Sequence, residues 1–278
     1  MLENWWLLIP GGVVAGLLAG MLGIGGGAFV VPFLTAAFGL PTVQAIGTSS
    51  LSIVMTSLSG TLQNWRMGNI DWWRTLGLGL ATFVTVPAGV AIAERLPDHW
   101  LKACFGLLLL VNVLLSLWKR QVARAAAAKA ARVADAASSE QQTPLPPVVG
   151  RGVTGGLAGF MAGLFGVGGG VIMVPLQMIL LGETIKVAIQ TSLSVIVLTG
   201  TISTLGHASE GNVLWVVGLI LGAGGIIGAQ VSTRFLPKLP ERVVQLTFNT
   251  MLVSFAIYMF WQAWASYGNA IALSRIVF

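Results

Sequence analysis

Hydrophobic residues along this chain gather into eight long blocks, which shorter polar stretches separate. The blocks lie at about 5–40, 42–63, 70–94, 99–118, 148–183, 185–206, 212–236 and 241–265. Because a membrane-spanning helix needs roughly 20 apolar residues, most of the blocks are long enough to span. The pattern predicts an all-α polytopic membrane protein with about eight to ten membrane segments.

The first and fifth blocks are longer than one span requires, and each contains a glycine cluster followed by a proline. The clusters are 23–27, before Pro32, and 166–170, before Pro175. Glycine weakens a helix and proline removes a backbone donor. We therefore expect the first helix of each half to be broken rather than straight.

The two halves of the chain are an internal duplication. A shift of 143 residues places Gly23 on Gly166 and, without a gap, MLGIGGGAFVVP (21–32) on LFGVGGGVIMVP (164–175). The chain is thus predicted to contain membrane repeat 1 (1–118), a polar linker (119–147) and membrane repeat 2 (148–278). Internal repeats in membrane proteins are typical of transporters, with the site at the repeat interface.

The distribution of basic residues indicates how the repeats are oriented. If each repeat crosses the membrane four times, nine Lys and Arg residues lie on one side and six on the other. If each crosses an odd number of times, twelve share a side and only Arg95, Lys102 and Arg275 oppose them. The second distribution agrees better with the positive-inside rule. We therefore predict inverted repeats in a bacterial-type inner (cytoplasmic) membrane, with the linker cytoplasmic and both termini outside.

Composition narrows the function classes. Hydrophobic residues make up 55% of the chain and charged residues 9%, against about 25% charged residues in average soluble domains. This excludes a soluble enzyme, a disordered protein and a nucleic-acid binder as first interpretations. One cysteine and two histidines offer little for a metal centre, so no metal and no cofactor are expected. The acidic residues fall at or near loops, which argues against a carboxylate proton relay deep in the bundle.

The doubled glycine motif is the first candidate binding feature. A broken helix presents free N–H groups and its positive dipole end, which together suit an anion. The alternative is that the glycines only allow tight helix packing. The candidate residues are Gly23, Gly25, Gly26, Gly27, Gly166, Gly168, Gly169 and Gly170.

Polar residues in the following block of each repeat are further candidates. Near its start, the hydroxyls of Thr48, Ser49, Thr191 and Ser192, together with Gln190, can hydrogen-bond an oxyanion, or can serve as caps and interhelical bonds. Near its end lie Asn64, Arg66 and His207, of which Arg66 or His207 can attract an anion and His207 can carry a proton. The alternative for this end is a polar loop at the membrane interface.

The combined motifs resemble those of the TauE/SafE family of sulfite and organosulfonate exporters. The resemblance rests on GIGGGAFVVPFL (23–34), GTSS (47–50), WRMGNIDW (65–72), GVGGGVIMVPL (166–176), QTSLS (190–194) and EGNVLW (210–215). It implies a substrate such as sulfite, thiosulfate, sulfoacetate or a related organosulfonate, with the glycine motifs and the Thr-Ser pairs lining the pathway. The pairing of Asn64 with His207 departs from two-fold equivalence.

The leading hypothesis is a secondary transporter of such an anion that works by alternating access. A passive anion channel, a subunit of a larger complex and a membrane-embedded enzyme are the alternatives. We do not expect an enzyme, because few residues could form a nucleophile with its base. The expected partners are the small anion, the lipid bilayer and a coupling ion, either H⁺ or Na⁺; no nucleic acid is expected, and the oligomeric state is left open.

Overall fold

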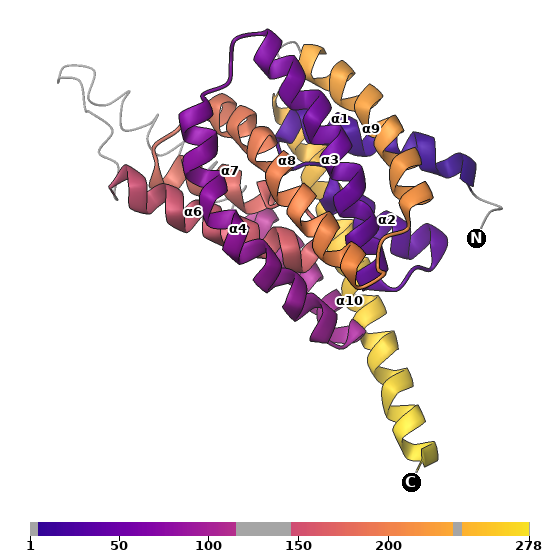
Figure 1. Cartoon of the computed structure of the whole chain (residues 1–278). Helices are drawn as coiled ribbons and strands as arrows, with labels where there is room; N and C mark the ends of the chain where they lie inside the picture. The colour runs from indigo at the N-terminus through magenta and orange to yellow at the C-terminus, as the bar shows by residue number, and fades with distance from the viewer. Residues whose placement is uncertain (1–4, 115–145, 236–240, 278) are drawn as a thin grey trace, which may run out of the picture.

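The computed structural model describes residues 5–114, 146–235 and 241–277, so the predicted linker lies almost entirely outside the described residues. Within the described ranges every regular element is helical, which confirms the all-α prediction. After a short 3₁₀ turn the first repeat contains α1 (Leu8–Leu22), α2 (Gly27–Phe38), α3 (Thr42–Arg66), α4 (Trp72–Arg95) and a helix at 98–114. The second contains α6 (Pro147–Phe165), α7 (Gly170–Leu180), α8 (Ile185–Ser209), α9 (Trp215–Phe235) and α10 (Glu241–Val277) (Figure 1).

The duplication seen in the sequence is also present in the backbone. Helices α2, α3 and α4 begin 143 residues before α7, α8 and α9, as Gly27 and Gly170 illustrate. The predicted breaks separate α1 from α2 and α6 from α7. Gly26, with φ 83°, precedes α2, and Gly169, with φ 76°, precedes α7. Glycine is favoured there because a side chain disfavours this left-handed backbone conformation.

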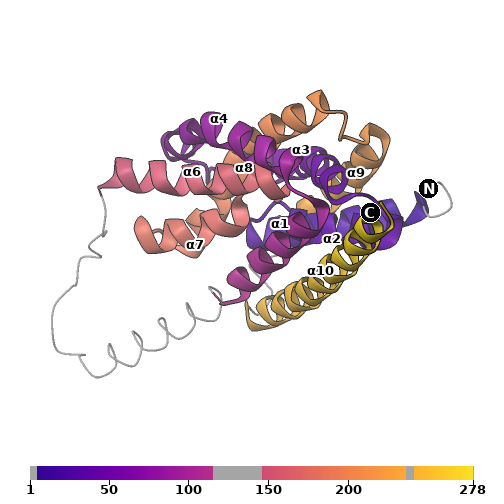
Figure 2. The ribbon, with the colours of Figure 1, turned by 90° about the horizontal axis from the view of Figure 1, so that it is seen from below.

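The two repeats are interleaved rather than stacked side by side. Helix α1 packs against α9 of the other repeat, and α6 packs in the same way against α4 (Figure 2). Glycines allow these close approaches, since a Cβ at Gly16 would clash with the Gly225 carbonyl, and one at Gly163 with the Val86 carbonyl. Each repeat therefore completes its packing with helices of the other.

The equivalent helices α3 and α8 lie side by side in the middle of the molecule and run antiparallel. Near the start of α3, Ser50 meets Ser203 late in α8, and near its end Gly60 meets Leu193 early in α8. Helix α3 buries many hydroxyls, against α8 and against other neighbouring helices. They belong to Thr42, Thr48, Ser49, Ser50, Ser52, Thr56, Ser57, Ser59 and Thr61. The centre of the bundle is consequently polar for a membrane protein.

Five helices among the described residues are long and apolar enough to cross a membrane. Their bounds are Trp5–Leu22, Trp72–Arg95, Val148–Phe165, Val187–Ser209 and Trp215–Arg234. The shorter helices α2 and α7 are also apolar. Large hydrophobic side chains such as Phe83 and Val84 of α4 and Val216 of α9 are exposed on the surface, as lipid-facing side chains are. The chain is an integral membrane protein.

Candidate functional site

The two glycine breaks contact each other at the interface between the repeats. A Cβ on Gly27 would collide with the Gly166 carbonyl, and one on Gly170 with the Gly23 carbonyl. All eight candidate glycines are buried. The structure thus brings together the two motifs that the sequence singled out.

Two serines hold these breaks together across the interface. Ser49 Oγ donates to the Gly166 carbonyl at 3.0 Å, and Ser192 Oγ donates to the Gly23 carbonyl at 2.6 Å. Ser49 and Ser192 are equivalent in the two repeats, so the bonds are reciprocal. Since each hydroxyl has one hydrogen, donating to an anion would require it to leave its carbonyl.

The first turns of α2 and α7 supply the amides expected of an anion site. The first N–H groups of a helix have no partner within that helix, and the helix dipole adds positive potential there. Gly26 and Gly169 occupy the positions just before the two helices, with no side-chain cap. The glycines add no side chain of their own there, but the side chains of Ile53 and Ile196 lie against the two helix starts.

The other predicted residues divide between this centre and the two ends of the bundle. Thr48 is buried and its Oγ1 accepts a hydrogen bond from the Leu214 amide at 3.1 Å. Thr191 is buried and Gln190 is half-buried in the first turns of α8. The structure does not bring Asn64, Arg66 and His207 together. Asn64 is buried near the end of α3, Arg66 is the exposed last residue of α3, and His207 is buried near the end of α8.

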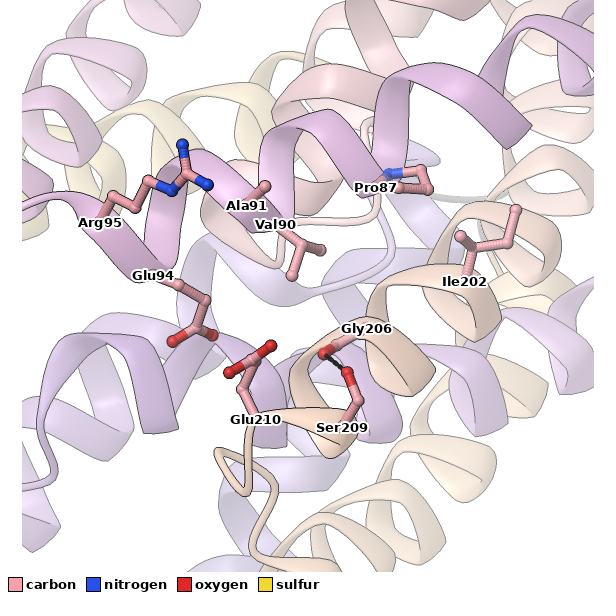
Figure 3. A pocket seen from close by; sticks show the side chains of 9 residues that line it. All are labelled: Pro87, Val90, Ala91, Glu94, Arg95, Ile202, Gly206, Ser209 and Glu210. Atoms are coloured by element: carbon pink, nitrogen blue, oxygen red, sulfur yellow. Dashed lines mark hydrogen bonds between the residues drawn. The ribbon is translucent and has the colours of Figure 1, made fainter.

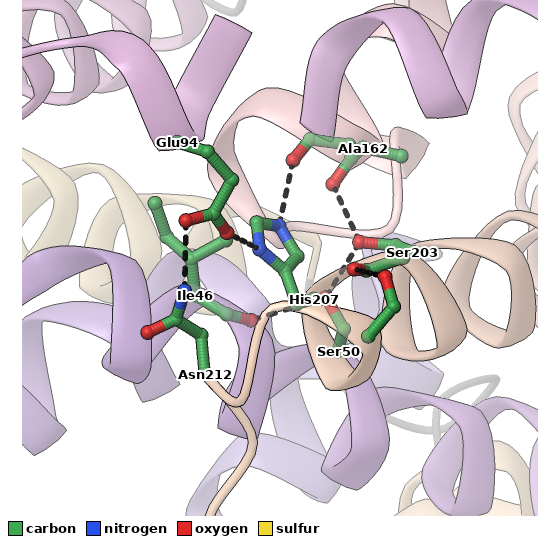
Figure 4. A network of polar contacts seen from close by, with 10 residues as sticks. Ile46, Ser50, Glu94, Ala162, Ser203, His207 and Asn212 are labelled. Carbon is green, nitrogen blue, oxygen red and sulfur yellow. Dashed lines mark hydrogen bonds and ion pairs between the residues drawn. The ribbon is translucent and has the colours of Figure 1, made fainter. Parts of the chain in front are cut away.

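A polar network surrounds His207 at the end of α8 (Figure 4). Its imidazole is 0% exposed. Nδ1 lies 2.8 Å from Glu94 Oε1, and Nε2 lies 3.0 Å from the Gly163 carbonyl. Asn212 donates to the second Glu94 oxygen at 2.7 Å. The alternative of a polar interfacial loop is therefore wrong for His207, which is a buried helix residue.

A pocket of about 450 Å³ lies beside this network (Figure 3). Its charged lining residues are Glu94, Arg95 and Glu210. Figure 3 shows the carboxylates of Glu94 and Glu210 pointing into the pocket from α4 and from the end of α8. Glu94 thus connects the buried imidazole with the pocket.

A second carboxylate near this end of the molecule has a different environment. Asp98, at the start of helix 98–114 and outside the five candidate spans, accepts from the Thr42 amide at 3.2 Å and pairs with Lys102. Burial alone would raise the pKa of Asp98, but the hydrogen bonds from Lys102 and Thr42 outweigh burial and lower that pKa. Asp98 therefore stays ionised and is a poor proton carrier near neutral pH.

Reasoning from the sequence missed Glu94 as a partner of His207. It placed Glu94 near a loop, but the carboxylate belongs to the last turn of α4 and reaches the buried imidazole. The missed signal was an acidic residue inside the last turn of an apolar block, in one repeat only.

Comparison with known proteins shows to which family this helical bundle belongs. A family model described as "Sulfite exporter TauE/SafE" matches residues 8–259, which include both repeats and both glycine breaks. The chain belongs to the TauE/SafE family. The resemblance expected from the motifs is thereby confirmed, and the chain is a member of a family of membrane transporters.

Several known proteins are similar to this chain over nearly their full length. The chain is 27% identical to the "Probable membrane transporter protein YunE" of Bacillus subtilis, over 89% of this chain and 94% of that protein. It is 26% identical to the "Probable membrane transporter protein MJ0441" of Methanocaldococcus jannaschii, over 91% and 94%. A "Probable membrane transporter protein" of Xylella fastidiosa strain Temecula1 is 28% identical, over 95% and 98%. No solved structure matches this TauE/SafE chain.

Proposed function

We propose that this protein is a secondary transporter that moves a small sulfur-containing anion, such as sulfite, thiosulfate, sulfoacetate or a related organosulfonate, by alternating access. The family description supports the substrate class. The buried amides of the two glycine breaks support an anionic ligand, because helix starts bind oxyanions without a cofactor. Among the described residues of this interface no contact pairs a buried nucleophile with a base, so the interface gives no support to an enzyme.

The observation that carries the proposal is the reciprocal pair of bonds from Ser49 to Gly166 and from Ser192 to Gly23. Each bond joins the third helix of one repeat to the broken helix of the other. Rearrangement of one bond frees a serine hydroxyl, which can then donate to an anion at the glycine break on its own side of the interface. Alternating access requires two such equivalent devices, one for each side. Thr48, Gln190 and Thr191 would line the route beside these serines, and Asn64, Arg66 and His207 would lie at its two ends.

We further propose that the repeats are inverted in the inner membrane, with the linker cytoplasmic and both termini outside. The antiparallel run of the equivalent helices α3 and α8 supports this orientation, since parallel repeats would place equivalent spans in the same direction. The basic residues support it too, with twelve on the linker side. They are Arg66, Arg74, Lys119, Arg120, Arg124, Lys129, Arg132, Arg151, Lys186, Arg234, Lys238 and Arg242.

The orientation is tested by labelling single cysteines in intact cells. Cys104 is the only native cysteine, so a Cys104→Ser background allows one cysteine at Ala130 and another after the C-terminus. We expect an impermeant maleimide to label the C-terminal cysteine and to reach position 130 only after lysis. Labelling of both from the same side would contradict inverted repeats.

The substrate class is tested with purified protein. Sulfite, thiosulfate, sulfoacetate, sulfate and acetate are compared by thermal shift, because a ligand raises the melting temperature of the state it binds. Proteoliposomes then measure uptake of the stabilising anion. Saturable uptake with counterflow supports a carrier, whereas non-saturating flux without counterflow supports the passive channel. Stabilisation by acetate alone would contradict the sulfur-anion class.

A further inference from the structure

The buried imidazole of His207 stands between two hydrogen-bond acceptors. The Gly163 carbonyl, 3.0 Å from Nε2, can only accept, so Nε2 must carry a hydrogen. On the other side Nδ1 faces the Glu94 carboxyl at 2.8 Å. Asn212 already donates to the second Glu94 oxygen, so that oxygen is an acceptor as well.

Counting hydrogens shows that this arrangement holds an exchangeable proton. If Glu94 is ionised, Nδ1 must donate to it and His207 is an imidazolium. If the imidazole is neutral, Glu94 must be protonated and donate to Nδ1. Both forms contain one proton more than a neutral imidazole beside a carboxylate. When that proton leaves, the single remaining N–H cannot serve both acceptors, and one contact becomes repulsive.

We propose that His207 and Glu94 form the binding site of a coupling proton, and that its loss separates α8 from either α6 or α4. This inference rests on the proposed transport function and adds the coupling ion to it. The site suits a proton better than Na⁺, because Nε2 and the Asn212 amide both direct hydrogens at the surrounding oxygens. A cation would need those oxygens free.

The proton site is connected to one glycine break through the last turn of α6. Gly163 lies next to Ala162, whose carbonyl accepts from the Gly166 amide at 2.9 Å. Ser203 donates to the same Ala162 carbonyl at 3.4 Å and pairs with Ser50 at 2.9 Å. A change in the contact at Gly163 therefore acts on the turn that ends at the Gly166 break.

The proton reaches the site through the pocket. Glu94 lines the pocket and its side chain is 20% exposed, whereas His207 is fully buried. The other charged residues facing the site are Arg95, on α4, and Glu210, at the end of α8. On its other sides the imidazole contacts Gly47 of α3 and Gly163 of α6, and neither residue has a titratable side chain.

The described residues contain one such proton site, because the equivalent positions of the duplication carry other residues. The shift of 143 residues gives Asn64 as the counterpart of His207 and Pro237 as the counterpart of Glu94, and neither counterpart has a titratable side chain. Proton binding therefore acts on one end of the bundle only. Coupling to a gradient across the membrane also requires that a proton bound from one side is released to the other, so the change of helix contacts must move the access of the site from one side to the other.

The first arm of the test measures proton-driven transport. Proteoliposomes take up labelled thiosulfate, a dianion that does not itself protonate near neutral pH, with or without an imposed pH gradient. We expect the gradient to stimulate uptake by the unaltered protein. His207→Asn, which copies the residue of the other repeat, and Glu94→Gln should bring the ratio of uptake with the gradient to uptake without the gradient close to one. Asn69→Ala, the counterpart of Asn212 at the other end, is the matched control and should keep the stimulation.

The second arm needs no substrate. In a Cys104→Ser background, Ala91→Cys places a thiol in the pocket. Its maleimide labelling rate is divided by that of the same thiol in the unfolded chain, which corrects for the intrinsic ionisation of the thiol. Between about pH 6 and pH 8 we expect this ratio to change in the background protein and to stay constant in His207→Asn and Glu94→Gln.

The outcomes of the two arms separate the two proposals. Failure of the unaltered protein to take up thiosulfate or any other anion counts against the proposed function, and the labelling arm still decides the proton site. A labelling ratio that does not change with pH, or that changes equally in His207→Asn, overturns the proton site. Gradient-driven uptake that survives in both variants overturns it as well. Glu94→Gln carries the test if His207→Asn does not fold, as judged by gel filtration.

Discussion

The two ends of the bundle use the same helices but differ in their polar contacts. At the end where α8 stops, Ser50 pairs with Ser203, and His207 pairs with Glu94. At the opposite end the residues equivalent to Ser50 and Ser203 are Leu193 and Gly60, which make an apolar contact. The α3–α8 contact is thus made by hydrogen bonds at one end and by packing at the other, where the polar contacts between the repeats include the ion pair of Arg74 with Glu183 at 2.8 Å.

This difference separates what the repeats share from what makes them unequal. Both repeats keep the glycine break and the serine that bonds to the opposite break. These shared parts belong to the device that must work on both sides of the membrane. The pair of His207 and Glu94 occurs at one end alone among the described residues, and in the mechanism proposed above only that end binds the coupling proton.

The largest expected effect comes from the shared part. Gly26→Leu and Gly169→Leu should each abolish anion uptake, because φ is 83° and 76° and a side chain would strike the carbonyl of Ala15 or Ala158. Membrane insertion should persist. Gly152→Leu on α6 is the control, since a Cβ there meets nothing within 4 Å. Normal uptake in either break variant would remove that break from the transport device.

Replacing Ser50 with leucine, the residue at the equivalent position of the other repeat, should lower the stability of the protein unless Ser203 is replaced as well. Ser50→Leu should lower the free energy of unfolding by about 2–3 kcal/mol, through overpacking and a lost hydrogen bond. Adding Ser203→Gly recreates the Leu193–Gly60 pair and should recover about 1 kcal/mol or more. Thermal unfolding in detergent measures the cycle. Additive effects would show that the two ends do not pack alike.

The asparagines before α4 and α9 should also differ. Asn212→Ala should lower the free energy of unfolding by about 1–2 kcal/mol, because its amide donates to the partly exposed Glu94 carboxylate. Asn69→Ala should change it by less than about 0.5 kcal/mol, since Asn69 is exposed. Equal effects in the same unfolding measurement would contradict the asymmetry.

The smallest difference between equivalent residues is expected for the shared serines. Ser49→Ala and Ser192→Ala should each lower the free energy of unfolding by about 1 kcal/mol, because a buried glycine carbonyl loses its donor. Thermal unfolding of the two variants should give similar values. A large difference between them would mean that the breaks are not held equivalently.

Much of the fold could be predicted from the sequence, because it depends on local chemistry. Block lengths predicted long helices, and the glycine runs before Pro32 and Pro175 predicted the breaks. Glycine is required there by backbone conformation, so the signal is local and appears in both repeats. The side chains that complete the site depended on which helices meet, and here the sequence was silent.

The sequence by itself determined the class, the duplication and the location of both breaks, since apolar length, repeated register and left-handed glycines are properties of neighbouring residues. Only the tertiary structure decided that Ser49 bonds to Gly166 and that Glu94 meets His207, which is 113 residues away. The repeats are interleaved, so each polar contact joins helices from different halves of the chain. The physical reason is burial: once α4, α6 and α8 pack together, a polar group with no water must find its partner among whatever side chains and carbonyls the packing brings near.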